Sequence, residues 1–526
     1  MAGLFEVFRL FPGFPRVCGA FVLLCLLPCC QGGNILVFPV DGSHWVNMKV
    51  LLEELHQRGH SLTVIREANS MYIAETSPLY TVINIKVQGY WGDFSDFLQD
   101  VIRGLRQGRQ MHKEFFNKIL DFHSFWAESL DNFLDDEAMV RRLKDSHFDL
   151  VITDPAVLVG VVLAKYLDLP VVLNVRWIPG DEGHFAIAPS PLSYVPVPGS
   201  GLTDKMDFFQ RVKNVLLYSF STFQRKFFLD PVFNAVCEKH LKVGCDTTSL
   251  LQGADIWLFR SDFVFDFPRP TMPNVVYIAG FQCKPAHPLP ADLEDFVQSA
   301  GEDGVVVMSL GTLVNAMPPE DAEEVAAVFA KLPQKVIWRH KGPRPSTVGN
   351  NTLIVDWMPQ TDLLGHPQVK LFVAHGGTNG LQEAIYYGVP VLGIPLFFDQ
   401  PDNLLRLQER GAAKILELDQ LTRGFEESLK EVLHQDGYRR NMQRLSRLHR
   451  DQPTAPMERA LFWVEYVMRH KGAPHLRTQA YEMPWYAYYG LDLVLALATT
   501  ATVLLLSASA LFRFLCCRKK RKNKQQ

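Results

Sequence analysis

The chain has 526 residues, of which 48% are hydrophobic and 21% charged, and this balance excludes a disordered or collagen-like protein. At about 100–200 residues per domain, the length predicts two to four domains. The formal net charge of −3 hides an asymmetry, because the last nine residues, 518–526, hold six Lys or Arg and no acidic residue. The rest has 47 basic and 56 acidic residues, a charge of −9, which argues against a nucleic-acid-binding protein.

The N-terminal segment is typical of a secretory signal. Arg9 and Arg16 precede the apolar run 17–27, and small residues follow near position 30. This order of charged, apolar and small residues predicts a signal peptide over 1–32. A buried first helix is the alternative, but the prolines of this segment disfavour it.

A β-α-β pattern follows the signal. The apolar stretch 34–40 predicts a buried strand, 45–58 a helix, and 61–65 a second strand. The same alternation returns as a strand, a helix and a strand over 148–152, 155–166 and 170–173.

Two aromatic-rich helical regions, 91–144 and 208–228, interrupt this pattern. The second region, which also carries Arg and Lys, has three open interpretations. It lies on a membrane surface, covers an apolar substrate pocket, or packs as an ordinary helix.

A Pro-rich stretch over 281–303 predicts an interdomain linker, and a second α/β alternation follows it. Its expected strands are 304–309, 335–339, 370–374 and 390–394. Its expected helices are 319–331, 379–387, 399–410, 425–434, 438–447 and 457–470. Two such halves predict two facing Rossmann-like domains, with a cleft at the carboxyl ends of their strands.

The C-terminus carries a second apolar run. The stretch 493–512 has 20 residues without charge, enough to cross a hydrocarbon core of about 30 Å. Aromatic residues precede it and a basic cluster follows, which predicts a single-pass span with the main body in the lumen and a short cytosolic tail. Lys522 and Lys524 resemble a dilysine retrieval signal of endoplasmic reticulum membrane proteins, and a plain stop-transfer tail is the alternative.

Three cysteines are expected in the lumen: Cys237, Cys245 and Cys283. An odd count of three predicts no disulfide framework, and none has the paired spacing of a metal site. The sequon Asn350-Asn351-Thr352 marks Asn350 as a glycosylation site.

The densest polar motif, His375-Gly376-Gly377-Thr378-Asn379, joins an expected strand to an expected helix. Glycines let the backbone approach a ligand closely, and the free N–H groups of a helix start suit a phosphate. Glu383, one turn later, can accept hydrogen bonds from a ribose. A purely structural tight turn would explain this motif equally well on its own.

The flanks of this turn add specificity. Trp357 can stack on a base, Gln360 can reach a ring edge or a ribose, and Asp399 with Gln400 can bond sugar hydroxyls. The run 357–400 resembles the signature of the UDP-glycosyltransferase superfamily. Together with the signal, the span and the basic tail, it resembles the vertebrate microsomal UDP-glucuronosyltransferases.

The resemblance implies a GT-B fold, an N-terminal acceptor domain and a C-terminal UDP-sugar domain. The domains are expected at 1–32 (signal), 33–280 (acceptor), 281–303 (linker), 304–450 (UDP-sugar), 451–490 (closing helices), 491–515 (span) and 516–526 (tail). The donor-binding residues that it implies are Ser309, Arg339, Trp357, Gln360, His375, Gly377, Thr378, Asn379, Glu383, Asp399 and Gln400.

His44 and Asp154 each follow an expected strand and so lie beside the predicted cleft. A neutral imidazole can take the proton of an acceptor hydroxyl, and a carboxylate can orient it. By spacing alone, a helix-capping histidine and a turn aspartate are the favoured interpretation. The resemblance implies instead a general base and its partner in an inverting transfer that needs no metal and no cofactor besides the UDP-sugar co-substrate.

Arg260 resembles an arginine tied to the sugar carboxylate in glucuronate-using members, so UDP-glucuronate is the expected donor, with UDP-glucose or UDP-galactose as alternatives. A surface arginine is the structural alternative. The expected acceptors are small lipophilic molecules, and a lipid such as a ceramide stays open. Two other functions also stay open, an epimerase of the same fold and a catalytically silent membrane-tethered partner subunit. The sequence also leaves open whether the protein forms a homo- or hetero-oligomer.

Overall fold

A computed structural model describes residues 32–85, 90–109, 112–176, 183–312, 314 and 316–522. All but the last residue of the predicted signal peptide, and Lys524 of the predicted retrieval signal, lie outside these ranges. The chain forms two compact units, Met1–Ala473 and Pro474–Gln526.

The first unit contains two parallel sheets, and the first of them has seven strands in the order β3-β2-β1-β4-β5-β6-β7. These strands are β1 (Asn34–Phe38), β2 (Ser61–Glu67), β3 (Thr81–Ile85), β4 (Leu150–Thr153), β5 (Val171–Val175), β6 (Ile256–Phe259) and β7 (Val275–Tyr277). The helices between them are α2 (Ser43–Gln57), α3 (Tyr90–Arg106), α4 (His112–Asp135), α5 (Glu137–Asp145), α6 (Val159–Leu167), α7 (Gly183–Ile187), α8 (Phe208–Gln224), the π-helical η2 (Arg225–Leu229), α9 (Asp230–His240) and α10 (Thr247–Gln252).

The second sheet has six parallel strands in the order β10-β9-β8-β11-β12-β13. They are β8 (Val305–Ser309), β9 (Lys335–Arg339), β10 (Thr352–Val355), β11 (Val369–Ala374), β12 (Val391–Gly393) and β13 (Ala413–Ile415). The helices of this part are α11 (Ala291–Gln298), α12 (Pro319–Phe329), α13 (Gln360–Gly365), α14 (Thr378–Tyr387), α15 (Gln400–Glu409), the 3₁₀ turn η3 (Leu418–Gln420), α16 (Leu421–His434), α17 (Asp436–Arg450) and α18 (Pro456–His470).

Both sheets wind in the same way. In each, the first strand lies at the centre and the chain moves outward to one side before it returns to the other, which is the doubly wound Rossmann order. The order reverses between β1 and β4 in one sheet and between β8 and β11 in the other. The prediction of two Rossmann-like halves is therefore confirmed.

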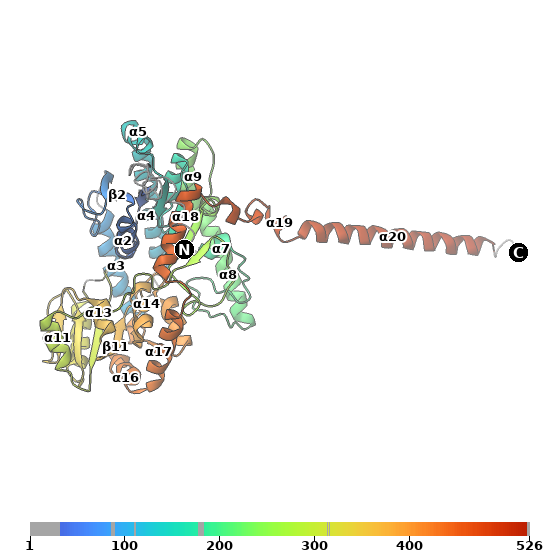
Figure 1. Ribbon diagram of the computed structural model, residues 1–526. Helices are drawn as coiled ribbons and strands as arrows, with labels where there is room; N and C mark the ends of the chain where they lie inside the picture. The colour runs from blue at the N-terminus through green and yellow to red at the C-terminus, as the bar shows by residue number, and fades with distance from the viewer. Residues whose placement is uncertain are drawn as a thin grey trace, which may run out of the picture. The chain divides into compact units, whose positions relative to one another are not determined.

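The two halves exchange helices. Leu98, Val101 and Ile102 of α3, which comes from the first half of the chain, belong to the core of the second sheet. Conversely, α18 packs against α2, β6 and β7 of the first sheet, where Figure 1 shows it among the early helices. The predicted boundaries at 280 and 304 separate the two α/β patterns of the sequence, but α3 and α18 each pack against the sheet of the other half.

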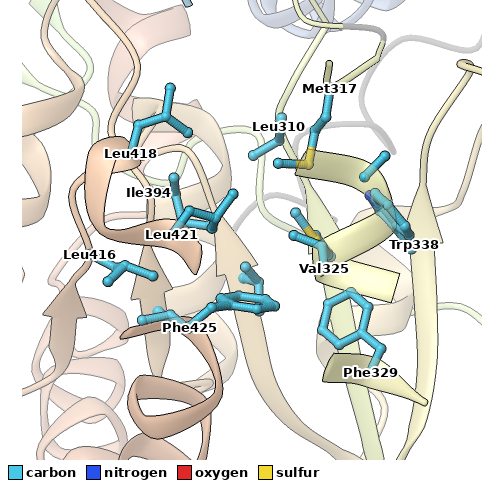
Figure 2. Close-up of a cluster of buried hydrophobic side chains, with 14 of the residues drawn as sticks. Leu310, Met317, Val325, Phe329, Trp338, Ile394, Leu416, Leu418, Leu421 and Phe425 are labelled. Carbon is cyan, nitrogen blue, oxygen red and sulfur yellow. The ribbon is translucent and has the colours of Figure 1, made fainter. Parts of the chain in front are cut away.

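The core beside the second sheet is continuous from strand to helix. Figure 2 shows Phe329 of α12 and Phe425 of α16 meeting beneath Trp338 of β9. The ring centroids of Phe329 lie 5.9 Å from Trp338 and 5.5 Å from Phe425, both in edge-to-face contact. These large buried side chains fix the strands whose ends form the site.

Two details differ from the sequence predictions. The expected linker 281–303 contains α11, and Leu293 and Val297 of this helix are buried in the second core. Cys237 and Cys245 form a disulfide, although an odd cysteine count predicts no framework, and Cys283 is free. A single disulfide needs only two cysteines, so an odd number of cysteines does not exclude one.

Helix α8 exposes a row of large apolar side chains, among them Phe208, Phe209, Leu216 and Phe220. It is therefore not an ordinary packed helix. Its residues do not line the cavity described below, so its position gives no support to the pocket-cover interpretation.

The second unit consists of η4 (Pro474–Leu476), η5 (Gln479–Tyr481), α19 (Trp485–Tyr488) and α20 (Leu491–Lys522). The stretch Leu491–Cys516 of α20 is 26 residues long, has a mean hydropathy of 2.0 and is wholly exposed. By length and composition it can cross a membrane, as the sequence predicts for 491–515.

Candidate active site

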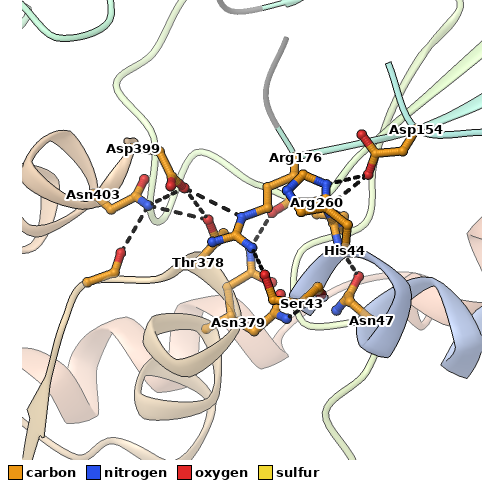
Figure 3. Close-up of polar contacts among 12 residues, drawn as sticks. Ser43, His44, Asn47, Asp154, Arg176, Arg260, Thr378, Asn379, Asp399 and Asn403 are labelled. Carbon is orange, nitrogen blue, oxygen red and sulfur yellow. Dashed lines mark hydrogen bonds and ion pairs between the residues drawn. The ribbon is translucent and has the colours of Figure 1, made fainter. Parts of the chain in front are cut away.

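A cavity of about 400 Å³ lies between the two sheets of the first unit and is lined from both. Its walls come from the segments that follow the carboxyl ends of β1, β5, β8, β11 and β12, where parallel sheets of this type bind ligands. Figure 3 shows the polar residues on the two sides of its centre.

His44 and Asp154 form a buried pair on the first side. His44 lies in the first turn of α2, just after β1, and Asp154 follows β4, the neighbouring strand. The distance between His44 Nδ1 and Asp154 Oδ2 is 2.7 Å (Figure 3). Asp154 also accepts a hydrogen bond from the backbone N–H of Ala156. Strand pairing thus brings together two residues that lie 110 positions apart in the chain.

The charges of this pair suit a base. Burial lowers the pKa of His44, although the neighbouring Asp154 opposes the shift. Burial would raise the pKa of Asp154, but the charge and hydrogen bond of His44, the charge of Arg260 and the Ala156 N–H together lower it. At neutral pH the carboxylate is ionised and accepts the Nδ1 proton, so Nε2 of a neutral His44 is left as the acceptor.

Arg260 lies behind the pair. Its side chain follows β6, is only 3% exposed, and is absent from the cavity lining. Its Nη1 donates to Asn47 Oδ1 at 2.6 Å, and its Nη2 lies 3.7 Å from Asp154 Oδ2. The structure therefore directs this guanidinium towards the dyad, whereas the sequence prediction assigns it to a sugar carboxylate.

The glycine-rich turn after β11 lies on the second side. Burial lowers the pKa of His375 to about 4, so its ring is neutral at physiological pH. The ring fits between two glycines, because a Cβ on Gly311 or Gly377 would lie 2.6 or 2.5 Å from its atoms. In the described part of the chain its Nδ1 has no hydrogen-bond partner, as expected of a group that meets a ligand. The turn opens onto the N-terminus of α14, whose free N–H groups favour an anion.

The far end of the cavity carries the aromatic residue and the carboxylate predicted for a nucleoside. Trp357 lines the cavity with 65% of its surface exposed, and the Arg339 guanidinium lies 5.7 Å from its ring centroid. Glu383 accepts from Gln360 Nε2 at 2.7 Å and from Thr361 Oγ1 at 3.1 Å. Burial raises the pKa of Glu383 in spite of these bonds.

The centre of the cavity is closed by Asp399 at the start of α15. It accepts hydrogen bonds from Thr378 Oγ1 at 2.9 Å and from Asn403 Nδ2 at 2.7 Å (Figure 3). Gln400 accepts from the backbone N–H of Leu396 at 2.9 Å and so shapes the turn before α15. Phe398 of this turn has a φ of +59°, a left-handed conformation that is costly for a bulky residue and typical of functional sites.

Most predicted donor residues line this cavity. They are Ser309, Arg339, Trp357, Gln360, His375, Gly377, Asn379, Glu383, Asp399 and Gln400. Thr378 lies behind Asp399 as its hydrogen-bond donor. Asn379 also reaches across the cavity, where its Nδ2 lies 3.4 Å from the Ser43 carbonyl. Asn350 lies on the surface, exposed as a glycosylation site must be.

Sequence reasoning missed Arg176 and Ser43. Arg176 directly follows β5 and lines the cavity, with its Nη1 2.6 Å from Ser43 Oγ. The rule that selected His44 and Asp154, a polar residue at the carboxyl end of a strand, also selects Arg176. It escaped because the expected strand ended at residue 173 and the observed strand ends at Val175.

Comparisons with known proteins agree with this geometry. The family model described as "UDP-glucoronosyl and UDP-glucosyl transferase" matches residues 33–526. UDP-glucuronosyltransferase 2A2 of Mus musculus is 40% identical over 506 residues, which cover 93% of this chain and 95% of that protein. UDP-glucuronosyltransferase 2C1 of Oryctolagus cuniculus is 41% identical over 478 residues, which cover 89% of this chain and 95% of that protein.

Solved structures with low sequence identity share the fold. The spinosyn forosaminyltransferase SpnP has a TM-score of 0.57 at 16% identity, covering 83% of this chain and 99% of its own. A UDP-glucose:anthocyanidin 3-O-glucosyltransferase in complex with UDP has a TM-score of 0.55 at 16% identity, covering 84% and 99%. These similarities confirm the predicted GT-B architecture.

Proposed function

Because the chain belongs to the UDP-glucoronosyl and UDP-glucosyl transferase family, and is thus an enzyme that transfers a sugar from a UDP-sugar to an acceptor, we propose that it transfers glucuronate from UDP-glucuronate to small lipophilic acceptors. The mechanism rests on the His44–Asp154 pair, whose Nδ1 and Oδ2 atoms lie 2.7 Å apart. His44 lines one side of the cavity, and the proposed phosphate-binding turn lines the other side. The donor is proposed because relatives at 39–41% identity are named UDP-glucuronosyltransferases.

His44 acts as the general base in this proposal. Its Nε2 takes the proton of the acceptor hydroxyl while the hydroxyl oxygen attacks the anomeric carbon of the donor sugar. Asp154 fixes the tautomer and stabilises the imidazolium that forms, and Arg260 in turn holds Asp154. Attack from the face opposite UDP inverts the anomeric configuration from α to β.

The bond between the anomeric carbon and the UDP oxygen breaks in the same step, and its electron pair leaves with the diphosphate. Negative charge therefore grows beside His375 and the N-terminus of α14. Hydrogen bonds from these groups stabilise the charge in the transition state, and a metal-independent reaction is proposed on this basis. In this proposal Trp357 stacks on uracil, Glu383 with Gln360 binds the uridine, and Asp399 with Gln400 holds the sugar.

The acceptor is proposed to be lipophilic because apolar side chains line the cavity near His44. They include Val40, Val46, Phe122 and Ala156. Such a wall excludes water from the base and favours apolar acceptors. A lipid acceptor is the alternative within the same chemistry.

The proposed location is the endoplasmic reticulum membrane, with the catalytic unit in the lumen. The apolar helix α20 supports a single-pass anchor, and the Cys237–Cys245 disulfide supports an oxidising compartment for the first unit. The basic residues that follow the apolar stretch Leu491–Cys516 support a cytosolic tail.

A donor competition tests the proposal. Microsomes that express the full chain would be given UDP-glucuronate, UDP-glucose and UDP-galactose separately and in equal mixture, with a simple phenol as acceptor. The proposal expects the β-glucuronide to dominate the products. Dominant glucoside or galactoside would overturn the donor assignment and leave the transferase mechanism in place.

A further inference from the structure

We propose that Arg176 binds the carboxylate of the donor sugar and is the residue that determines donor specificity. The inference rests on the proposed use of UDP-glucuronate. It concerns which of two arginines near the dyad reads the charged sugar, and it assigns that role to the arginine that faces the cavity.

Arg176 lies between the proposed base and the proposed sugar-binding residue. Arg176 follows β5 and lines the cavity, and its side chain is 9% exposed. On one side its Nη1 donates to Ser43 Oγ at 2.6 Å, next to His44. On the other side its Nε lies 3.7 Å from Asp399 Oδ2, too far for a hydrogen bond (Figure 3). The guanidinium is thus fixed between the base and the residue proposed to hold the sugar.

The hydrogen bonds of Arg176 leave one of its donors available to a ligand. Its Nε is buried and has no hydrogen-bond partner among the residues that the structure describes. A buried donor of a charged group is costly to leave unpaired, so such an atom in an enzyme cavity indicates a ligand that pairs with it. The planar fork of an arginine matches the two oxygens of a carboxylate.

The charged residues that line the cavity also favour Arg176 as the partner of a sugar carboxylate. Among the described residues of the cavity lining, the acids are Asp41, Asp362, Glu383 and Asp399, and the cations are Arg176 and Arg339. Arg339 lies at the other end, near Trp357, and bonds the Gly311 carbonyl. A sugar carboxylate beside Asp399 would therefore be repelled unless Arg176 paired with it.

The charge of Arg176 also reaches the phosphate-binding turn. Burial is the main cause of the lowered pKa of His375, and the next cause is the positive charge of Arg176. The positive charge of Arg176 therefore acts on both His375 and His44, the two histidines between which the donor sugar is proposed to lie.

Arg260 differs from Arg176 in position, although its Nε and Nη2 are also buried without a hydrogen-bond partner among the described residues. Its guanidinium is 3% exposed, bonds Asn47 and faces Asp154, and it is absent from the cavity lining. It is a positioning residue that acts through the dyad. Its loss should impair transfer of every sugar to a similar extent, whereas the loss of Arg176 should depend on the charge of the sugar.

The test compares donors within each variant of the full-length microsomal enzyme. Arg176→Gln removes the charge and keeps a polar side chain, Arg176→Lys keeps the charge without the planar fork, and Arg260→Gln removes the buried arginine behind the dyad. Arg439→Gln is the matched control, since Arg439 is half-buried in α17 and bonds the Val369 carbonyl away from the cavity. For each, kcat/KM would be measured with UDP-glucuronate and UDP-glucose and one phenol acceptor.

Arg176→Gln is expected to lower the ratio of UDP-glucuronate to UDP-glucose turnover on the order of 10- to 100-fold, the effect of one lost charge-assisted hydrogen-bond pair. Arg176→Lys should lower it less, and Arg439→Gln should leave it unchanged. Equal losses with both donors in Arg176→Gln and Arg176→Lys, or a selective loss in Arg260→Gln alone, would overturn the inference. A wild-type enzyme that prefers UDP-glucose would instead overturn the proposed function.

Discussion

The two sheets of the first unit have the same winding, yet the equivalent strand ends carry different chemistry. In the first sheet, the segments after the central strands β1 and β4 hold His44 and Asp154, a buried ionisable pair. In the second sheet, the segments after β8 and β11 hold Gly311 and the neutral His375. In the proposed mechanism, the same topological position thus serves proton transfer in one half and anion binding in the other.

The difference lies in what each half depends on. The first half depends on two side chains from distant parts of the chain that stabilise each other's charge states. The second half depends on backbone shape, because its glycines leave room for the His375 ring and for a ligand. Substitutions of the dyad should therefore affect kcat, whereas substitutions in the glycine-rich turn of the second half should affect donor binding.

Loss of the base should have the largest effect. His44→Ala is expected to lower kcat by about 10²- to 10⁴-fold, because no other group takes the acceptor proton. UDP binding should persist, since the proposed nucleotide contacts come from the second half. Initial rates of UDP release and a UDP binding titration would be measured on the same microsomes.

His56→Ala is the control for this substitution, because His56 is exposed near the end of the same helix α2. Its rates should match those of the wild type. Equal rates for His44→Ala and the wild type would contradict the assignment of the base. Such a result would also contradict the proposal that the first half performs proton transfer and the second half binds the donor.

Asp154→Asn should come next, with a loss of about 10²-fold or more, because an amide cannot stabilise the imidazolium or select its tautomer. The wild-type rate should fall only below pH 6.5, as His44 with its lowered pKa becomes protonated. Asp154 raises that pKa against the effect of burial, so the acid limb of the variant should move to lower pH. A pH profile of kcat/KM would show this, and a limb that moves upward would count against the pairing.

In the second half, Gly377→Ala should mainly weaken donor binding. The new Cβ would lie 2.5 Å from His375 Nε2 and displace the ring. We expect the KM for the UDP-sugar to rise about tenfold, as for a lost charge-assisted hydrogen bond. Gly437→Ala in α17 is the control, because its Cβ would meet no atom within 4 Å. A larger effect on kcat than on KM would contradict a role in donor binding alone.

The same contrast explains what the sequence could predict. The donor turn is contiguous, so the run 357–400 revealed nearly all of its residues, whereas the dyad needed the family resemblance before its spacing became informative. The strands that were missed are β3, β6, β7, β10 and β13, and all of them except β6 lie at the edge of a sheet. Edge strands are partly exposed, as in the Thr352–Val355 stretch, and lack the continuous apolar run of a central strand such as β8.

Tertiary relations were not predictable from local patterns. The position of Arg260 behind Asp154 and the packing of α3 on the second core depend on contacts between segments far apart in sequence. The mutual exchange of helices has the same origin. Local apolar periodicity predicts that a helix is buried on one face but not which sheet covers that face.

Trp357 should give the smallest effect and the sharpest check of the second half. Its ring is 65% exposed, so its loss does not disturb the core, and any effect reports a contact with the ligand. Trp357→Ala should raise the donor KM about 3- to 10-fold through the lost stacking, with a smaller effect on kcat, and Trp357→Phe should restore most of the affinity. Trp485→Ala, which removes a tryptophan of 67% exposure from the second unit, should not change the donor KM. If Trp357→Phe is as impaired as Trp357→Ala, stacking is not the contact, and the nucleoside end of the cavity depends on Glu383 and Gln360 instead.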